Sequence, residues 1–176
     1  VLAAAAVAAL VAISGRARPA GAAEYPERPI TLVVPYEAGG GNDVIARLVA
    51  AKMSTALGKP IVVENRGGAG STIGTRYVAK ANADGYTILI ATSALAINPS
   101  LYPDAGYDPK KDFAPIGLIA TSANLVLVRP SLPVHSMAEL VALAKKEPGK
   151  LNFASTGTGT STHLAAELFA AMAGVK

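Results

Sequence analysis

An apolar run that leads through three consecutive glycines into a helical pattern is the feature that most constrains this fold. Residues 30–34 (ITLVV) are continuously apolar, as expected of a strand buried on both faces of a parallel sheet. The first turn, 35–43 (PYEAGGGND), follows, and apolar residues then recur at helical spacing over 43–57. The glycines let the backbone approach a ligand closely, and Asn42 or Asp43 can cap the helix. Free N–H groups and the helix dipole at this helix start would favour an anion.

The same pattern occurs twice more along the chain. The second turn, 65–74 (NRGGAGSTIG), follows a strand expected at 61–64, and the third turn, 155–163 (STGTGTSTH), follows one expected at 151–154. A single glycine-rich turn can be no more than a tight connection. Three turns rich in Gly, Ser and Thr fit the rule that open α/β sheets bind ligands beyond the carboxyl ends of their strands. The sequence therefore predicts a binding site at that edge.

The first half of the chain has the alternating pattern of a parallel α/β fold. Strands at 30–35, 61–64 and 86–92, with helices at 43–57 and 72–82, form a βαβαβ series with helices on the faces of the sheet. We expect the helix 43–57 to leave Arg47 and Lys52 facing water. Its expected buried residues are Val44, Ile45, Leu48, Val49, Met53 and Leu57.

After residue 92 the pattern changes. A loop at 101–113 precedes two apolar segments, 116–120 and 125–128, which we interpret as the crossing into a second lobe. Ser136 is expected to cap a helix that runs to Lys146, with Glu139 at capping-box spacing, before a strand at 151–154 and a helix at 162–173. We predict a first ligand-binding lobe at 24–122 and the start of a second at 123–176. Because one strand-helix-strand-helix unit could hardly bury its sheet, we expect this sequence to be an N-terminal fragment.

The first residues predict export. Residues 1–13 (VLAAAAVAALVAI) have the length of a signal-peptide apolar core, and the small residues at 20–23 suit a signal peptidase. We predict a signal peptide at 1–23 whose basic n-region is missing, with cleavage after Ala22 or Ala23, and a periplasmic location. A retained N-terminal anchor is the alternative. Export would permit disulfides, but the sequence contains no cysteine.

Several chemistries are excluded by the residues present. Without cysteine, and with two histidines, neither thiol catalysis nor a His-rich metal site is available, and the glycine turns lack P-loop and dinucleotide-binding spacing. An esterase would have to use His163 with Ser155 or Ser161, but no carboxylate stands at an obvious relay position. The acidic residues of the loop 101–113 lack calcium-loop spacing, and the lysine pairs form no basic stripe. We therefore predict no enzyme, cofactor, metal or nucleic-acid partner.

Five stretches of the chain together resemble a known family. They are YPERPITLVVPYEAGGGNDVIARLVA, VVENRGGAGSTIG, DGYTILIATSALAINPSLYP, YDPKKDFAPIGLIA and LNFASTGTGTSTHLAAELF, within residues 25–175. In order and spacing they resemble the Bug-type periplasmic solute receptors of tripartite tricarboxylate transporters. The resemblance implies an α/β protein of the type II periplasmic binding protein kind. Two lobes of mainly parallel sheet flanked by helices would close on a small carboxylate, and the second lobe is truncated here.

The resemblance also implies a set of ligand-binding residues, with Asp43 orienting the turn or its waters rather than touching the carboxylate. These residues are Tyr36, Gly39, Gly40, Asn42 and Asp43 in the first turn, Ala69, Gly70, Ser71 and Thr72 in the second, Thr92, Ser93 and Asn98 at the following edge, and Ser155, Thr156, Gly157, Gly159, Thr160 and His163 in the second lobe.

The chain departs from the family pattern at three points. Glu37 stands where a small or apolar residue is usual, which alters the field of the first turn. Gly67 and Ser71 replace the usual Pro and Gly of the second turn. The chain is also shorter than family members, which run to roughly 300 residues, so the remainder of the second lobe would be missing.

The resulting expectation is an exported receptor, monomeric at full length, that captures a small organic carboxylate and delivers it to membrane transport subunits. Lobe closure would be the mechanism. The alternative is a ligand-sensing periplasmic module whose bound form docks on a signalling partner. The sequence does not specify which acid is bound.

Overall fold

The computed structural model describes residues 24–176, so the expected signal peptide and its cleavage site lie outside the described residues. Within them, strands and helices alternate up to residue 101, and only helices follow. The elements are β1 (Ile30–Val34), α2 (Gly41–Leu57), β2 (Ile61–Asn65), the 3₁₀ helix η2 (Ala69–Ser71), α3 (Thr72–Ala79), β3 (Thr87–Leu89), α4 (Ala94–Leu101), α5 (Met137–Lys146) and α6 (Ser161–Ala173).

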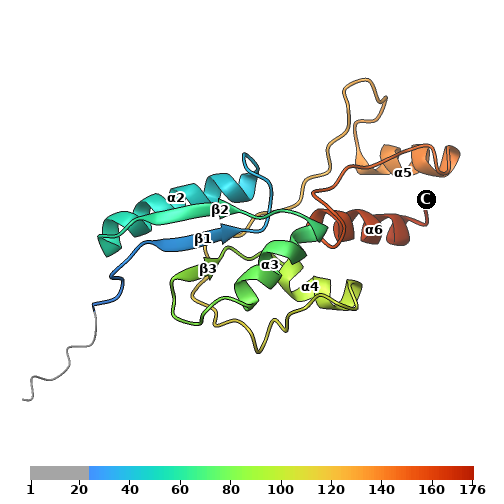
Figure 1. Cartoon of the computed structure of the whole chain (residues 1–176). Helices are drawn as coiled ribbons and strands as arrows, with labels where there is room; N and C mark the ends of the chain where they lie inside the picture. Colours follow the sequence, from blue (N-terminus) through green and yellow to red (C-terminus); the bar gives the residue numbers. More distant parts are fainter. Residues whose placement is uncertain (1–23) are drawn as a thin grey trace, which may run out of the picture.

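The three strands form one parallel sheet in the order β2-β1-β3. Leu32 in the central strand lies opposite Val63 of β2 and Ile88 of β3. Figure 1 shows α2 on one side of this sheet and α3 with α4 on the other. β1 is therefore covered from every direction, which explains its continuous apolar sequence and the burial of Val33 and Val34. The predicted βαβαβ series is confirmed, although β3 and α3 are shorter than expected.

The prediction of which face α2 buries was largely wrong. Ala46 and Ala50 are the buried apolar residues of this helix, and Met53 packs partly buried against the core. Val44 and Leu48 are 52% and 65% exposed. The small alanine side chains let the helix backbone approach the sheet, so the larger residues lie on the flank and the opposite face. Helical periodicity fixed the spacing of the apolar residues, but only packing decided which stripe meets the sheet.

Helix α4 was not predicted, because Pro99 lies inside it. Proline has no N–H, so the carbonyl of Leu95, four residues earlier, loses its helical donor. The Tyr107 hydroxyl donates to that carbonyl at 3.2 Å. The loop that follows the helix thus supplies the hydrogen bond that proline removes.

The expected capping of α5 is confirmed. Ser136 Oγ accepts the Glu139 N–H at 3.2 Å, and the Glu139 carboxylate accepts the His135 N–H at 2.7 Å. Glu139 thus reaches the residue before the cap rather than the cap itself, which still ties the chain entering the helix to its first turn.

The apolar segments 116–120 and 125–128 and the predicted strand 151–154 form no strand among residues 24–176. Ile116 and Leu127 are almost fully exposed, at 84% and 85%. A strand needs a neighbour to satisfy its backbone groups, and none pairs with these segments here. No residue of α6 is buried. Among the described helices, none has the length and apolar character needed to cross a bilayer.

Gly74 should tolerate substitution poorly. A Cβ at this position of α3 would lie 2.6 Å from the Arg66 carbonyl oxygen and 2.8 Å from Pro35 Cβ. Because the first of these is backbone, Gly74→Ala should lower the free energy of unfolding by about 1–3 kcal/mol despite alanine's better helix propensity. Gly41→Ala in α2, where a Cβ meets nothing within 4 Å, is the control. Urea denaturation that ranks Gly74→Ala at or above the control in stability would contradict this packing.

Candidate functional site

The first turn presents free N–H groups at the start of α2. Gly40 is the N-cap residue and no side chain caps the helix, so the expected capping by Asn42 or Asp43 does not occur. Among the described residues, the N–H groups of Gly41, Asn42 and Asp43 have no hydrogen-bond acceptor. These donors point out of the helix end, where the helix dipole adds partial positive charge. This is the arrangement that binds a carboxylate or phosphate.

Asp43 holds the first turn in shape rather than pointing at a ligand. Its Oδ2 accepts the Gly39 N–H at 2.9 Å and the Arg47 Nε–H at 3.0 Å, and its Oδ1 accepts an amide hydrogen of Asn65 at 3.1 Å. Asn65 also donates to the Tyr36 carbonyl at 3.2 Å and accepts from Arg47 at 3.2 Å. The network joins the first turn, α2 and the end of β2.

Hydrogen bonds to the ionised form keep Asp43 charged. The side-chain bond from Arg47, followed by the backbone N–H of Gly39, lowers the pKa of Asp43 from 3.8 to about 2. Burial of the side chain, 4% exposed as a residue, opposes this shift but does not overcome it. Arg47 balances the negative charge, so the helix start keeps its preference for anions.

The second turn uses an unusual backbone. Ala69 and Ser71 both have positive φ, at 47° and 82°, which non-glycine residues rarely adopt. The Ser71 N–H donates to Gly68 and the Thr72 N–H to Ala69, so these two amides are already occupied. Asn98 stabilises the turn from α4, because its side-chain amide donates to the Gly70 carbonyl at 2.7 Å and to Thr72 Oγ1 at 3.2 Å.

The edge after β3 connects to the first turn. The Tyr36 hydroxyl and Thr92 Oγ1 are 2.6 Å apart, and Thr92 Oγ1 also accepts the Ala94 N–H at 3.3 Å. Ser93 is the N-cap residue of α4, and its carbonyl accepts from the first turn of that helix. The carboxyl ends of the three strands therefore share one polar edge, as the sequence predicted.

Four amides of the third turn form hydrogen bonds within that turn, whereas the N–H groups of Ser161, Thr162 and His163 at the start of α6 have no acceptor among the described residues. The Thr156 N–H donates to Thr162 Oγ1, the Gly159 N–H to His163 Nδ1, and the Thr160 N–H to the Gly157 carbonyl. The Gly157 N–H donates to Ser155 Oγ at 3.3 Å. These four amides, which the sequence suggested as ligand donors, are therefore occupied. Among the described residues, no hydrogen bond joins His163 to Ser155 or Ser161.

The second and third turns touch each other directly. A Cβ on Gly70 would overlap the Thr158 carbonyl oxygen, and one on Gly159 would overlap Asn98 Oδ1. Asn98 is fully buried, and its Oδ1 has no hydrogen-bond partner among the described residues. Glycine at position 70 thus lets the second turn approach the third, and glycine at position 159 leaves room for the Asn98 side chain of α4. The structure brings all three predicted turns to one region.

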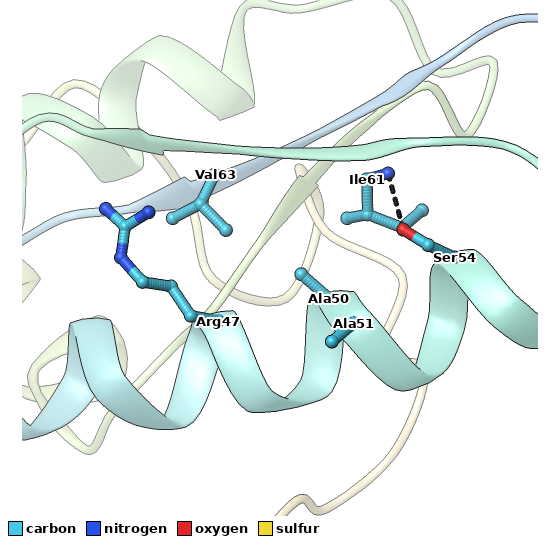
Figure 2. A pocket seen from close by; sticks show the side chains of 6 residues that line it. All are labelled: Arg47, Ala50, Ala51, Ser54, Ile61 and Val63. Atoms are coloured by element: carbon cyan, nitrogen blue, oxygen red, sulfur yellow. Dashed lines mark hydrogen bonds between the residues drawn. The ribbon is translucent and has the colours of Figure 1, made fainter.

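Two hollows of the described structure lie away from these turns. One of about 310 Å³ lies between α2 and β2, where Ala50 and Ala51 leave space and the Ile61 N–H donates to Ser54 Oγ at 2.9 Å (Figure 2). Another of about 430 Å³ runs along α6 and is lined by Ala165, Leu168, Phe169, Met172 and Ala173. Neither is lined by a predicted site residue. Among the described residues, no cluster of acidic or histidine side chains could hold a metal ion.

The sequence matches the family described as "Tripartite tricarboxylate transporter family receptor" over residues 45–176. The chain belongs to this family. It is 40% identical over 161 residues to BugT of Bordetella pertussis, covering 90% of this chain and 49% of that protein. The chain spans about half the length of the relatives it matches. The Bug-type resemblance is thereby confirmed.

Solved structures share the fold. Similar structures include Rpa4515 of R. palustris with adipate, with a TM-score of 0.83 and 44% identity over 86% of this chain and 51% of that one. MatC (Rpa3494) from Rhodopseudomonas palustris with bound malate has a TM-score of 0.77 and 33% identity over 86% and 52%. The periplasmic binding protein BugD has a TM-score of 0.75 and 40% identity over 86% and 51%. The predicted fold class is confirmed.

Two residues of the site region were not predicted from sequence. Asn65 and Arg47 complete the network around Asp43, the former from the end of β2 and the latter from the next turn of α2. A polar residue that directly precedes a glycine turn, such as Asn65, was the available signal. The periodicity of α2 predicts Arg47 facing water, and its side chain is 56% exposed, but it also pairs with Asp43 at i,i+4 spacing.

The charge of Asp43 should govern stability in acid. Because its pKa is lowered to about 2 in the folded state, the ionised carboxylate stabilises the fold above pH about 4, and this contribution is lost as the pH falls towards 2. Asp43→Asn should therefore be less stable than the parent at neutral pH, with a difference that narrows as the pH falls through this range. Urea denaturation across this pH range would measure the difference. Asp104→Asn, at an exposed carboxylate, is the control, and a pH-independent difference for Asp43→Asn would refute this role.

Proposed function

We propose that this chain forms part of an extracytoplasmic receptor that captures a small organic carboxylate in the periplasm and delivers it to membrane subunits of a tripartite tricarboxylate-type transporter. The observation that carries the proposal is the free helix start of α2, which offers three N–H donors beside a charge-balanced Asp43. Family relatives that hold adipate and malate support a carboxylate as the ligand class.

The available donors suffice for a receptor of ordinary affinity. Micromolar binding requires about 8 kcal/mol. A hydrogen bond to a charged group contributes about 1.5–3 kcal/mol. Hydrogen bonds from the three amides at the start of α2 would together contribute a binding free energy of the same order. Donors from the second turn or from the edge at Thr92 would add to it. The proposed function consists of ligand capture and release, which need no catalytic group.

The other predicted site residues would line the proposed site. Tyr36 and Thr92 lie together at the β1–β3 edge, and Asn98 fixes the second turn where it touches the third. In the third turn, where four amides are occupied, Thr156 and His163 would reach a ligand through side-chain atoms. Thr160 is 3% exposed and its hydroxyl donates to the Gly157 carbonyl at 2.6 Å, so it would shape the turn.

A ligand screen on the whole gene product tests the proposal. Thermal shifts with dicarboxylates, tricarboxylates, aromatic acids and acidic amino acids should identify at least one acid that raises the melting temperature. Loss of uptake of that acid in a strain lacking the gene, restored by the gene, would support the transport role. If no acid stabilises the protein, the proposed function is wrong.

Asp43→Ala separates turn geometry from simple charge. Removing a negative charge beside an anion site would raise affinity if charge alone mattered. We expect instead that calorimetric affinity for the identified acid falls by about tenfold or more, because Gly39 and Arg47 lose their shared acceptor. Asp104→Ala is the control. Unchanged or higher affinity in Asp43→Ala would reject the orienting role.

A further inference from the structure

The Glu37 carboxylate lies where the first and second turns meet. A Cβ built on Gly67 would overlap Glu37 Oε1 and come within 2.9 Å of the carboxyl carbon. A Cβ at position 67 would displace this carboxylate, which is the end of a flexible side chain. The two positions are therefore sterically coupled, and together they place an exposed carboxylate at the polar edge formed by the ends of β1 and β2.

This carboxylate is the uncompensated charge of that edge. Asp43 is paired with Arg47 at 3.0 Å, and Glu64 is paired with Arg66. Arg66 is further engaged, because its guanidinium stacks on the Tyr77 ring at 3.7 Å. Within the described chain, Glu37 has neither an ion-pair partner nor a side-chain hydrogen bond. A negative group without a partner is available to a ligand that lies beside it.

We propose that Glu37 selects the ligand, favouring a carboxylate that also carries an ammonium group over a dicarboxylate of the same length. This inference rests on the proposed function. The helix start of α2 takes the acid group, as it would for any carboxylate. Glu37, three residues before Gly40 in the same turn, attracts a cationic end and repels a second carboxylate. Gly67 is the residue that permits this placement.

The expected size of the change in affinity follows from the exposure of Glu37 to solvent. An exposed ion pair changes an equilibrium by only about two- to fivefold, and salt screens it. Attraction of the ammonium group and repulsion of the second carboxylate act in opposite directions on two ligands. Their affinity ratio should therefore change by about tenfold when Glu37 is neutralised, and by less at high salt. A purely structural role for Glu37 would alter both affinities together, without this salt dependence.

Adipate and 5-aminopentanoate are suitable probes, because the two molecules share a four-carbon chain and differ only in one end group. Calorimetric titration of the whole gene product should show tighter binding of 5-aminopentanoate. In Glu37→Gln, the ratio of the two affinities should shift by about tenfold towards adipate, and the shift should shrink in high salt. Glu27→Gln removes an exposed charge ahead of β1, at the opposite edge of the sheet, and should leave the ratio unchanged.

Gly67→Ala provides a second variant that keeps the charge but displaces the carboxylate. Gly67 does not have positive φ, so alanine is compatible with its backbone. We expect the same direction of change as in Glu37→Gln. Preference of the unmodified protein for adipate, or an unchanged ratio in both variants, would overturn the role of Glu37 while leaving the proposed function intact. If neither these probes nor any acid of the thermal-shift screen binds, the proposed function fails and this inference fails with it.

Discussion

The site depends on one shared acceptor, the carboxylate of Asp43. It collects hydrogen bonds from the backbone of the first turn, from the next turn of its own helix and from the end of a neighbouring strand. A glycine-rich segment has many accessible conformations, and this carboxylate restricts it to one. Because Arg47 compensates the negative charge of Asp43, the carboxylate that orders the turn does not also repel an anion. Asp43 thus orders the turn, and the N–H groups at the start of α2 supply the preference for an anion.

The three turns differ in how many of their amides are already hydrogen-bonded. The first turn keeps free donors at the start of α2, and two amides of the second turn bond to its own backbone. In the third turn four amides are occupied, and those at the start of α6 stay free. Gly70 allows the backbones of the second and third turns to approach each other, and Gly159 leaves room for the Asn98 side chain of α4, so these glycines serve packing rather than approach of a ligand. Equivalent sequence patterns therefore have different physical roles.

The most exposed apolar side chains lie in the part of the chain that follows α4. The segments containing Ile116 and Leu127 form no strand, and α6 buries none of its residues. In contrast, β1 is enclosed by two strands and by helices on both sides (Figure 1). The polar edge that carries the candidate site belongs to the well-enclosed part. Its geometry rests on a packed sheet and on the side-chain networks around Asp43 and Asn98.

The sequence by itself determined the parallel sheet, the positions of the glycine turns and the family. These follow from local pattern: a doubly buried strand must be apolar throughout, and a turn at a helix start needs residues without a Cβ in the way. Tertiary structure decided which stripe of α2 meets the sheet, because Ala46 permits a closer approach than Leu48. It also decided which amides stay free, and it brought Asn65 to Asp43 and Glu37 to Gly67. Those outcomes depend on contacts between residues distant in sequence, which no local pattern encodes.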